Sequence, residues 1–240
     1  MTYQPFTGPI LHDGGLGALA DALNDIEKTW IATGNRYRQL INTEPDEDGV
    51  LRGFGMPFDH PIVVQVAALR DGLDELLKAQ TKALERRMKT HPLAPWVAGT
   101  LGIGWKQGAR LLAATGDPFW NGLHGRPRTV SGLWAYCGLH TVEGDDGARC
   151  AAKRRKGTKS NWSSQAKMRT YLIAESCVKQ AKSPYRVVYD DRREQTAIAH
   201  SDWTKGHSHN DALRIMGKEI LQDLWLASRD IYVDRGWQLI

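Results

Sequence analysis

The chain has 240 residues, with a hydrophobic content of 41% and a charged content of 25%, as expected for a globular protein with one large core or two smaller ones. No apolar run approaches the roughly 20 residues of a membrane-spanning helix, and the N-terminus lacks the pattern of an export signal. The three cysteines have no ligand-like spacing, and their odd number argues against a disulfide framework. These features predict a cytoplasmic protein with no membrane partner. The net charge of +5 is weak evidence for a polyanionic partner.

The N-terminal region predicts two long helices. Apolar residues recur three, four or seven positions apart over residues 16–41 and again over 62–88, and an acidic segment with Gly and Pro separates the two stretches. We expect residues 1–90 to form a helical hairpin or coiled-coil arm that packs within the protein, contacts a protein partner or forms a homodimer. The leucines expected on its contact face are Leu69, Leu73, Leu76, Leu77 and Leu84.

A helix-hairpin-helix pattern opens the second predicted domain, residues 91–240. Residues 96–112 read as a short helix, a Gly102-Ile-Gly104 turn and a second helix with small residues on its packing face. Glycines let the backbone turn tightly and approach a phosphate, which the amides at the start of the next helix then attract. Lys106 and Arg110 would add contacts that do not depend on base sequence. The alternative is a turn with no role beyond joining two helices.

A run of basic residues without an acid follows between positions 149 and 159. We expect it to hold the DNA backbone, and the alternative is a solvated loop. Trp162, directly after the run, is either a core residue or a platform on which a base stacks. The basic residues are Arg149, Lys153, Arg154, Arg155, Lys156 and Lys159.

The rest of the chain predicts further helices and no sheet, so the expected fold class is all-α. One helix spans residues 129–138, with Thr129 as its N-cap and Gly138 as its stop. Another spans 162–182, capped by Ser160 or Asn161. Two more are expected near 185–196 and over 210–232, and little of the alternation typical of strands is present.

One group of residues has the side chains of a metal site. Its spacing is poor for a single helix, and no cysteine joins it, so we expect a solvated, DNA-facing or capping loop. No metal and no cofactor is predicted. The group consists of His200, Asp202, His207, His209 and Asp211.

Five features in chain order resemble a known family. They are the Gly102–Gly104 turn with its Ala109–Leu112 helix, the Gly116–Asp117 pair, the Ala135–Leu139 segment, the Met168–Arg169 pair and a C-terminal set of Lys205, His207, Ala212, Lys218 and Trp225. Together they resemble the C-terminal domain of transposases and bridge-RNA-guided recombinases, in which a RuvC-like nuclease domain acts with a serine. The resemblance runs from about Leu93 to Arg229.

The chain departs from that family at its catalytic groups. Only residues 1–92 precede the resemblance, and Asp13, Asp21 and Asp25 are spaced like one solvated helix face. Two-metal chemistry needs carboxylates that converge from separate elements. The loop that holds the family's serine is matched by residues 140–147, which contain acids and no serine.

The sequence therefore predicts a non-enzymatic protein of a phage or mobile element that binds double-stranded DNA at the nucleoid of a bacterial host and regulates site-specific recombination. The length and the helical arm also resemble recombination directionality factors of actinophages, which implies a large serine integrase as partner. Two alternatives stay open. One is a compact transposase or recombinase with Ser160 as nucleophile, and the other is a replication-associated DNA-binding protein.

Overall fold

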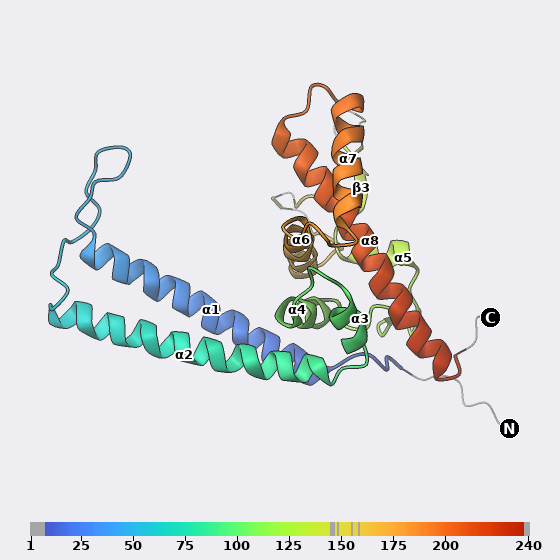
Figure 1. The fold of residues 1–240 in the computed structure, drawn as a ribbon, viewed down its shortest axis with the longest axis horizontal. Coiled ribbons are helices and arrows are strands. Elements are labelled where there is room, and N and C mark those ends of the chain that lie inside the picture. Colours follow the sequence, from blue (N-terminus) through green and yellow to red (C-terminus); the bar gives the residue numbers. More distant parts are fainter. Residues whose placement is uncertain (1–7, 145–146, 148, 155, 158, 238–240) are drawn as a thin grey trace. The chain divides into compact units, whose positions relative to one another are not determined.

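The structure is a computed structural model that describes residues 8–144, 147, 149–154, 156–157 and 159–237 (Figure 1). In this part of the chain, no helix is both long and apolar enough to cross a membrane. The expectation of a mainly helical fold is confirmed. The helices are α1 (Gly14–Ile41), α2 (Pro61–Lys89), α3 (Ala94–Gly99), α4 (Trp105–Thr115), α5 (Val130–Tyr136), α6 (Ser164–Val178), α7 (Arg186–Ala199) and α8 (Lys205–Asp234).

Two small antiparallel sheets were not predicted. Strand β1 (Trp120–Asn121) pairs with β2 (Arg126–Pro127), and β3 (Thr141–Glu143) pairs with β4 (Arg149–Ala151). Strands of two or three residues are too short to show an alternation of polar and apolar residues, which is the signal that sequence analysis requires. The second sheet fixes the start of the basic run, because β4 begins at Arg149.

The contacts divide the chain into two units. The smaller unit is Ala18–Arg86, and the larger unit contains the described residues up to Gly17 and from Arg87 onward. The sequence placed the division at residue 90, and the structure differs because the N-terminal segment packs with the larger unit. For example, the backbone N–H of Leu11 donates to Asp117 at 3.0 Å, a contact across more than a hundred residues that no local pattern shows.

The smaller unit contains most of α1 and α2 and the segment that joins them. Leu23 of α1 and Val63 and Leu84 of α2 are 1% exposed or less, so each helix buries one apolar stripe. Near the other end of α1, the guanidinium of Arg70 lies 4.5 Å from the centre of the Tyr37 ring. The two predicted helices are thus present, and one face of each is used within the unit.

The core of the larger unit lies around α8. This helix packs against α5, α6 and α7, and α4 packs against α6 (Figure 1). Close packing also explains Gly108, because a Cβ atom there would lie 2.8 Å from Val97 of α3. Large side chains at the centre are fully buried, each contributing roughly 1.5–3 kcal/mol of hydrophobic stabilisation. They include Leu111, Leu133, Ile173, Met216 and Ile220.

Helix ends follow local hydrogen bonds. The prediction for Thr129 is confirmed, because its hydroxyl accepts from the backbone N–H of Gly132 at 3.0 Å and starts α5. The prediction that Ser160 or Asn161 caps the next helix is wrong, because Ser163 accepts from the N–H of Ala166 and caps α6. The last helix, α8, starts at Lys205, five residues before the predicted start at residue 210.

A buried carboxylate joins three distant segments of the larger unit. Asp117 is 3% exposed, and its oxygens accept hydrogen bonds from the backbone N–H groups of Leu11, Phe119 and Trp120 and from the Tyr232 hydroxyl, at 2.6 to 3.0 Å. The ring of Phe119 contacts that of Tyr232, with centroids 4.9 Å apart. Asp117 therefore ties the N-terminal segment, the turn after α4 and the end of α8 together.

Candidate nucleic-acid interface

The segment predicted as a helix-hairpin-helix contains two helices, α3 and α4, joined by a turn. The turn covers residues 100–104, and Gly102 has a φ of +105°, a backbone conformation that a residue with a side chain rarely adopts. Gly104 is the N-cap of α4 and is exposed. The first amides of a helix have no partner within it, so the start of α4 offers hydrogen-bond donors and the positive end of the helix dipole.

The two glycines of the turn serve different purposes. A Cβ atom on Gly102 would lie 2.8 Å from Sγ of Cys177 and 3.0 Å from its Cα, so this glycine lets the turn pack on α6. Ile103, the next residue of the turn, is 6% exposed. A Cβ atom on Gly104 would meet nothing within 4 Å. Packing thus accounts for Gly102, while Gly104 stays open to a ligand.

The basic residues of α4 differ from the prediction. Arg110 is only 4% exposed, so very little of its side chain is accessible to a DNA phosphate, contrary to the prediction. Lys106 is half-buried. A cation that the sequence analysis missed, Lys89, lies 5.6 Å from the ring centre of Trp105, the first residue of α4. Lys89 is the last residue of α2, and only the tertiary fold shows that it lies beside the start of α4.

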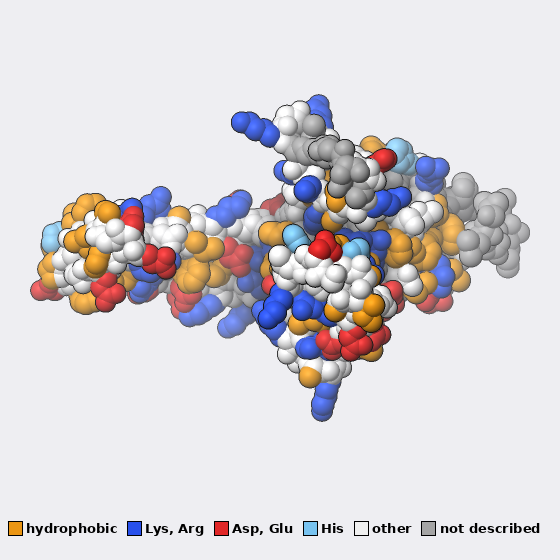
Figure 2. Space-filling model, turned by 90° about the horizontal axis from the view of Figure 1, so that it is seen from above, with side chains coloured by type: hydrophobic (Ala, Val, Ile, Leu, Met, Phe, Trp, Pro, Cys, Tyr) orange, Lys and Arg blue, Asp and Glu red, His pale blue; other side chains and the backbone are white. Residues whose placement is uncertain are grey.

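The predicted basic run begins in a hairpin. Strand β4 pairs Arg149 with Glu143 of β3, and the Nε of Arg149 donates to the hydroxyl of Thr141 at 3.1 Å. Arg155 lies outside the described residues. All the other cations of the run are exposed: Arg149, Lys153, Arg154, Lys156 and Lys159. Figure 2 shows Lys and Arg side chains protruding from the surface, with Asp and Glu side chains interspersed among them on the same face.

Trp162 anchors the end of the basic run. A Cβ atom on Gly138 would lie 2.8 Å from the Trp162 ring, and Gly138 has a φ of +65°, so the indole lies directly against this backbone turn. Lys167 of α6 lies 4.8 Å from the ring centre, and Arg154 of the basic run lies 5.7 Å from it. Cations this close to an indole are attracted to its face. The indole therefore holds cations near the surface rather than standing free as a platform for a base.

Further cations gather behind the basic run. Burial lowers the pKa of Lys167, and the nearby charge of Arg214 lowers it further. Burial and Arg214 also lower the pKa of Lys218. Asp211 neutralises part of this charge: burial alone would raise the pKa of its carboxyl, but hydrogen bonds from Arg214 and Arg192 outweigh burial and lower it. Mutual repulsion among these cations would be relieved by an anion.

A cavity of about 240 Å³ lies beside this cluster. Its wall is mainly apolar and comes from β4, α6 and α8, with Lys167 and Arg214 as its cations. It is lined by Leu139, Ala151, Lys167, Thr170, Tyr171, Asn210, Leu213 and Arg214. The cavity places apolar surface next to positive charge.

The histidine and aspartate group makes separate contacts. His200 stacks on Trp203 with ring centres 4.1 Å apart, while Nδ1 of His209 lies 2.7 Å from the Tyr189 hydroxyl. Asp211 binds Arg192 and Arg214, each at 2.6 Å. Among the described residues, no three His, Cys, Asp or Glu side chains are placed to hold a metal ion.

The predicted partner leucines of α2 fall into three classes. Leu84 is fully buried within the protein, so the prediction that it contacts a partner is wrong. Leu73 and Leu77 are half-buried. Leu69 and Leu76 are 57% and 52% exposed, and only these two offer a large apolar surface.

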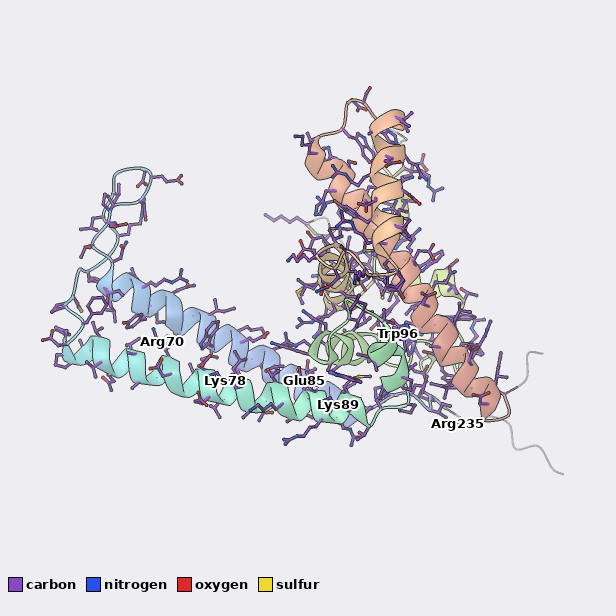
Figure 3. The ribbon with its side chains drawn as sticks, in the orientation of Figure 1. Arg70, Lys78, Glu85, Lys89, Trp96 and Arg235 are labelled. Carbon is purple, nitrogen blue, oxygen red and sulfur yellow. The ribbon has the colours of Figure 1, made fainter. Side chains whose placement is uncertain are left out.

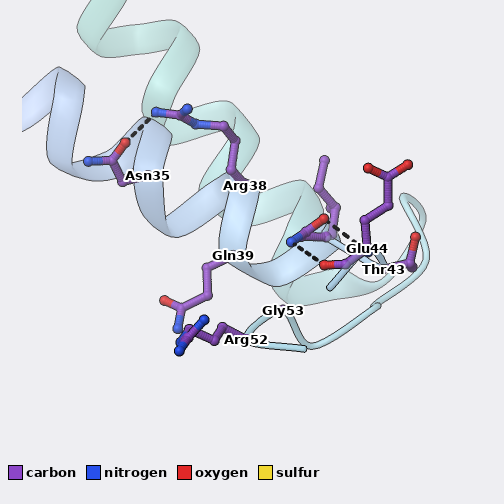
Figure 4. A pocket seen from close by; sticks show the side chains of 9 residues that line it. Asn35, Arg38, Gln39, Thr43, Glu44, Arg52 and Gly53 are labelled. Carbon is purple, nitrogen blue, oxygen red and sulfur yellow. Dashed lines mark hydrogen bonds between the residues drawn. The ribbon is translucent and has the colours of Figure 1, made fainter. Parts of the chain in front are cut away.

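The segment between α1 and α2 folds back on the end of α1. The N–H of Phe54 donates to the carbonyl of Gln39 at 2.9 Å, and Arg52 forms ion pairs with Asp46 and Asp48. An open hollow of about 660 Å³ lies there (Figure 4). Its polar groups partly satisfy one another: Asn42 exchanges two hydrogen bonds with the backbone of Glu44, and Arg38 bonds to Asn35.

No family model matches the chain, and no curated protein matches its sequence. The resemblance to transposases and the weaker one to directionality factors therefore stay predictions. The exposed basic run, the open N-terminus of α4 and the cluster of crowded cations all belong to the larger unit.

Proposed function

We propose that the chain binds double-stranded DNA through its phosphate backbone and acts without cutting it. The observation that carries the proposal is the basic run, whose described lysines and arginines are all exposed and whose two ends are fixed, by β4 at one side and by Trp162 at the other. Exposed lysines and arginines bind phosphates by releasing condensed counterions from DNA, and this binding does not depend on base sequence.

Sequence features support binding rather than catalysis. The segment that matches the serine loop of the transposases, residues 140–147, contains no serine. Ser160 is the alternative nucleophile, and it lies next to Lys159 at the end of the basic run. The enzyme alternative predicts a covalent DNA adduct that is lost when Ser160 is replaced by alanine, and our proposal predicts no adduct.

Charge reversal in the basic run tests the proposal. For Arg154→Glu with Lys156→Glu, we expect the dissociation constant for a labelled duplex to rise at least about 10-fold at roughly 0.1 M salt, because two phosphate contacts are lost. The slope of log affinity against log salt should become shallower by about 2. Fluorescence anisotropy over a salt series measures both quantities.

A matched control uses two exposed lysines after the other end of α6. Lys179→Glu with Lys182→Glu makes the same change in net charge away from the basic run. This variant should keep the salt slope of the parent protein. Equal losses in both double variants would show that binding follows net charge alone and would contradict a defined interface.

We further propose that the protein is an accessory factor of a phage or mobile element and regulates recombination by a large serine integrase. The smaller unit would act as a helical hairpin arm that reaches the integrase. Phe54 and Phe58, in the segment between α1 and α2, support this role because their side chains are 65% and 71% exposed. Exposed aromatic residues on a backbone held by hydrogen bonds are typical anchors of protein interfaces.

Replacing both phenylalanines tests this partner. Phe54→Ala with Phe58→Ala should abolish co-purification with a large serine integrase, while affinity for duplex DNA stays unchanged. The control is Leu123→Ala with Ile198→Ala, which removes apolar side chains that are 88% and 87% exposed in the larger unit. Failure of the parent protein to bind the integrase would reject the regulatory part and leave DNA binding standing.

A further inference from the structure

The cavity of about 240 Å³ in the larger unit is apolar inside and open to solvent at one side. It lies where α6 and α8 pack together beside β4, and Figure 3 draws the side chains of this region. Its buried lining residues include Leu139, Thr170 and Leu213. Ala151 and Tyr171 also line it but are exposed, so they mark its mouth.

One cation of the wall, Lys167, has no carboxylate beside it. Lys167 is half-buried, its Nζ donates to the carbonyl oxygen of Ala152, and it lies 4.8 Å from the ring centre of Trp162. Within the described part of the chain, no Asp or Glu forms an ion pair with it or raises its pKa. An ammonium group has more N–H donors than the bond to Ala152 uses. A partly buried charge of this kind is stabilised by an anion.

Arg214 adds a second positive charge to the wall. Its Nη2 lies 2.6 Å from a carboxylate oxygen of Asp211, and only 14% of its side chain is exposed. Asp211 also binds Arg192 at 2.6 Å, so one carboxylate serves two arginines. Burial and, after it, the charge of Arg214 lower the pKa of Lys167. A negative charge in the cavity would therefore stabilise both cations of the wall.

The apolar part of the wall decides what kind of body the anion carries. An inorganic ion would leave the apolar lining in contact with water. A nucleobase would bring several donors and acceptors, and each one that lost water without gaining a partner would weaken binding. An apolar body with one acidic group matches both parts of the wall. Because sites for drug-sized molecules have volumes of roughly 300–1,000 Å³, the ligand of this cavity is smaller.

We propose that this cavity binds a small carboxylic acid with an apolar body. Lys167 and Arg214 hold the carboxylate, because charge-assisted hydrogen bonds are stronger than those between neutral groups. Leu139 and Leu213 contact the apolar body. The proposal goes beyond DNA binding and does not rest on it, since the cavity has its own lining and is tested with small acids.

NMR titration of the full chain with benzoate tests the site. The backbone amides of the β4 and α6 residues that line the cavity should shift, because the ligand enters there. Benzoate should bind at least about 10-fold more tightly than benzamide, which has the same shape without the charge. It should also bind at least about 10-fold more tightly than acetate, which has the charge without the aromatic body.

Three variants separate the charge from the shape of the site. Lys167→Met keeps a long side chain without the ammonium group, so benzoate should bind about 10-fold more weakly while benzamide binds as before. Lys179→Met is the matched control, because it removes the same charge at the exposed C-cap of α6 and should leave benzoate binding unchanged. Ala151→Trp fills the mouth from an exposed position and should abolish binding of both probes. Circular dichroism should show the helix content of the parent protein in all three.

Several results would overturn the proposal. One is a parent protein that binds benzoate no more tightly than benzamide or acetate, and another is a Lys167→Met variant that binds benzoate like the parent. Inorganic phosphate that binds as tightly as benzoate would show that charge alone is recognised. Deoxyadenosine monophosphate that binds more tightly than benzoate and shifts the same amides would assign the cavity to a nucleotide instead.

Discussion

Replacement of Asp117 by alanine is expected to lower the free energy of unfolding of the larger unit by about 4 kcal/mol, since several buried donors would lose their shared acceptor. The carboxylate accepts four hydrogen bonds, three of them from backbone N–H groups that cannot turn elsewhere. Burial and the hydrogen bond to Asp117 also raise the pKa of the Tyr232 hydroxyl, so this group is a neutral donor at physiological pH.

Denaturant titration followed by tryptophan fluorescence measures the loss. Tyr232→Phe is the matched control, because it removes one of the four donors and leaves the carboxylate in place; it should cost only about 1 kcal/mol. Asp117→Asn should fall between the two, since its amide keeps one accepting oxygen. A value for Asp117→Ala within about 1 kcal/mol of the parent protein would show that water replaces the carboxylate.

The positions of the two long helices could be predicted because helix formation depends mainly on the local sequence. Residues 16–41 and 62–88 carry a repeated apolar pattern over many turns, and the structure places α1 and α2 within two residues of those bounds. The role of Asp117 could not be predicted in this way. Asp117 belongs to a motif of the family resemblance, but two of its hydrogen-bond partners, Leu11 and Tyr232, are more than a hundred residues away.

The sequence contained a signal against Arg110 as a DNA contact. It lies within Gly108–Thr115, where every residue except Ala113 is buried, so α4 is covered on nearly all sides. A helix that is apolar all round is a buried helix, and a charged residue in it is enclosed with its neighbours. The apolar pattern predicts the helix, and the number of faces that the helix buries follows from its tertiary contacts.

The cap of α6 shows where local chemistry is insufficient. Ser160, Asn161 and Ser163 are all good N-cap residues, and they lie within four positions. Packing of Trp162 against Gly138 fixes the chain just before Ser163, and the helix starts there. Similarly, Phe54 and Phe58 stood in a segment predicted as a break, and only the fold shows that their side chains are exposed.

Replacement of Gly102 by alanine is expected to destabilise the larger unit by about 3 kcal/mol, through backbone strain at positive φ and a steric clash. The new methyl group would lie 2.8 Å from Sγ of Cys177. Adding Cys177→Ala should recover only part of the loss, because the Cα of that residue remains 3.0 Å away and the φ of +105° is unchanged. Thermal or denaturant unfolding of the single and double variants measures both effects.

Gly104→Ala separates stability from binding at the same turn. Gly104 has a φ of −80° and open space around its Cβ position, so alanine should change the free energy of unfolding by less than about 1 kcal/mol. A methyl group there would nevertheless stand between the first amides of α4 and a phosphate, so affinity for duplex DNA should fall by roughly 5-fold, the loss of about one hydrogen bond. If Gly104→Ala binds DNA as tightly as the parent protein, the turn only joins two helices, and the basic run alone holds the DNA.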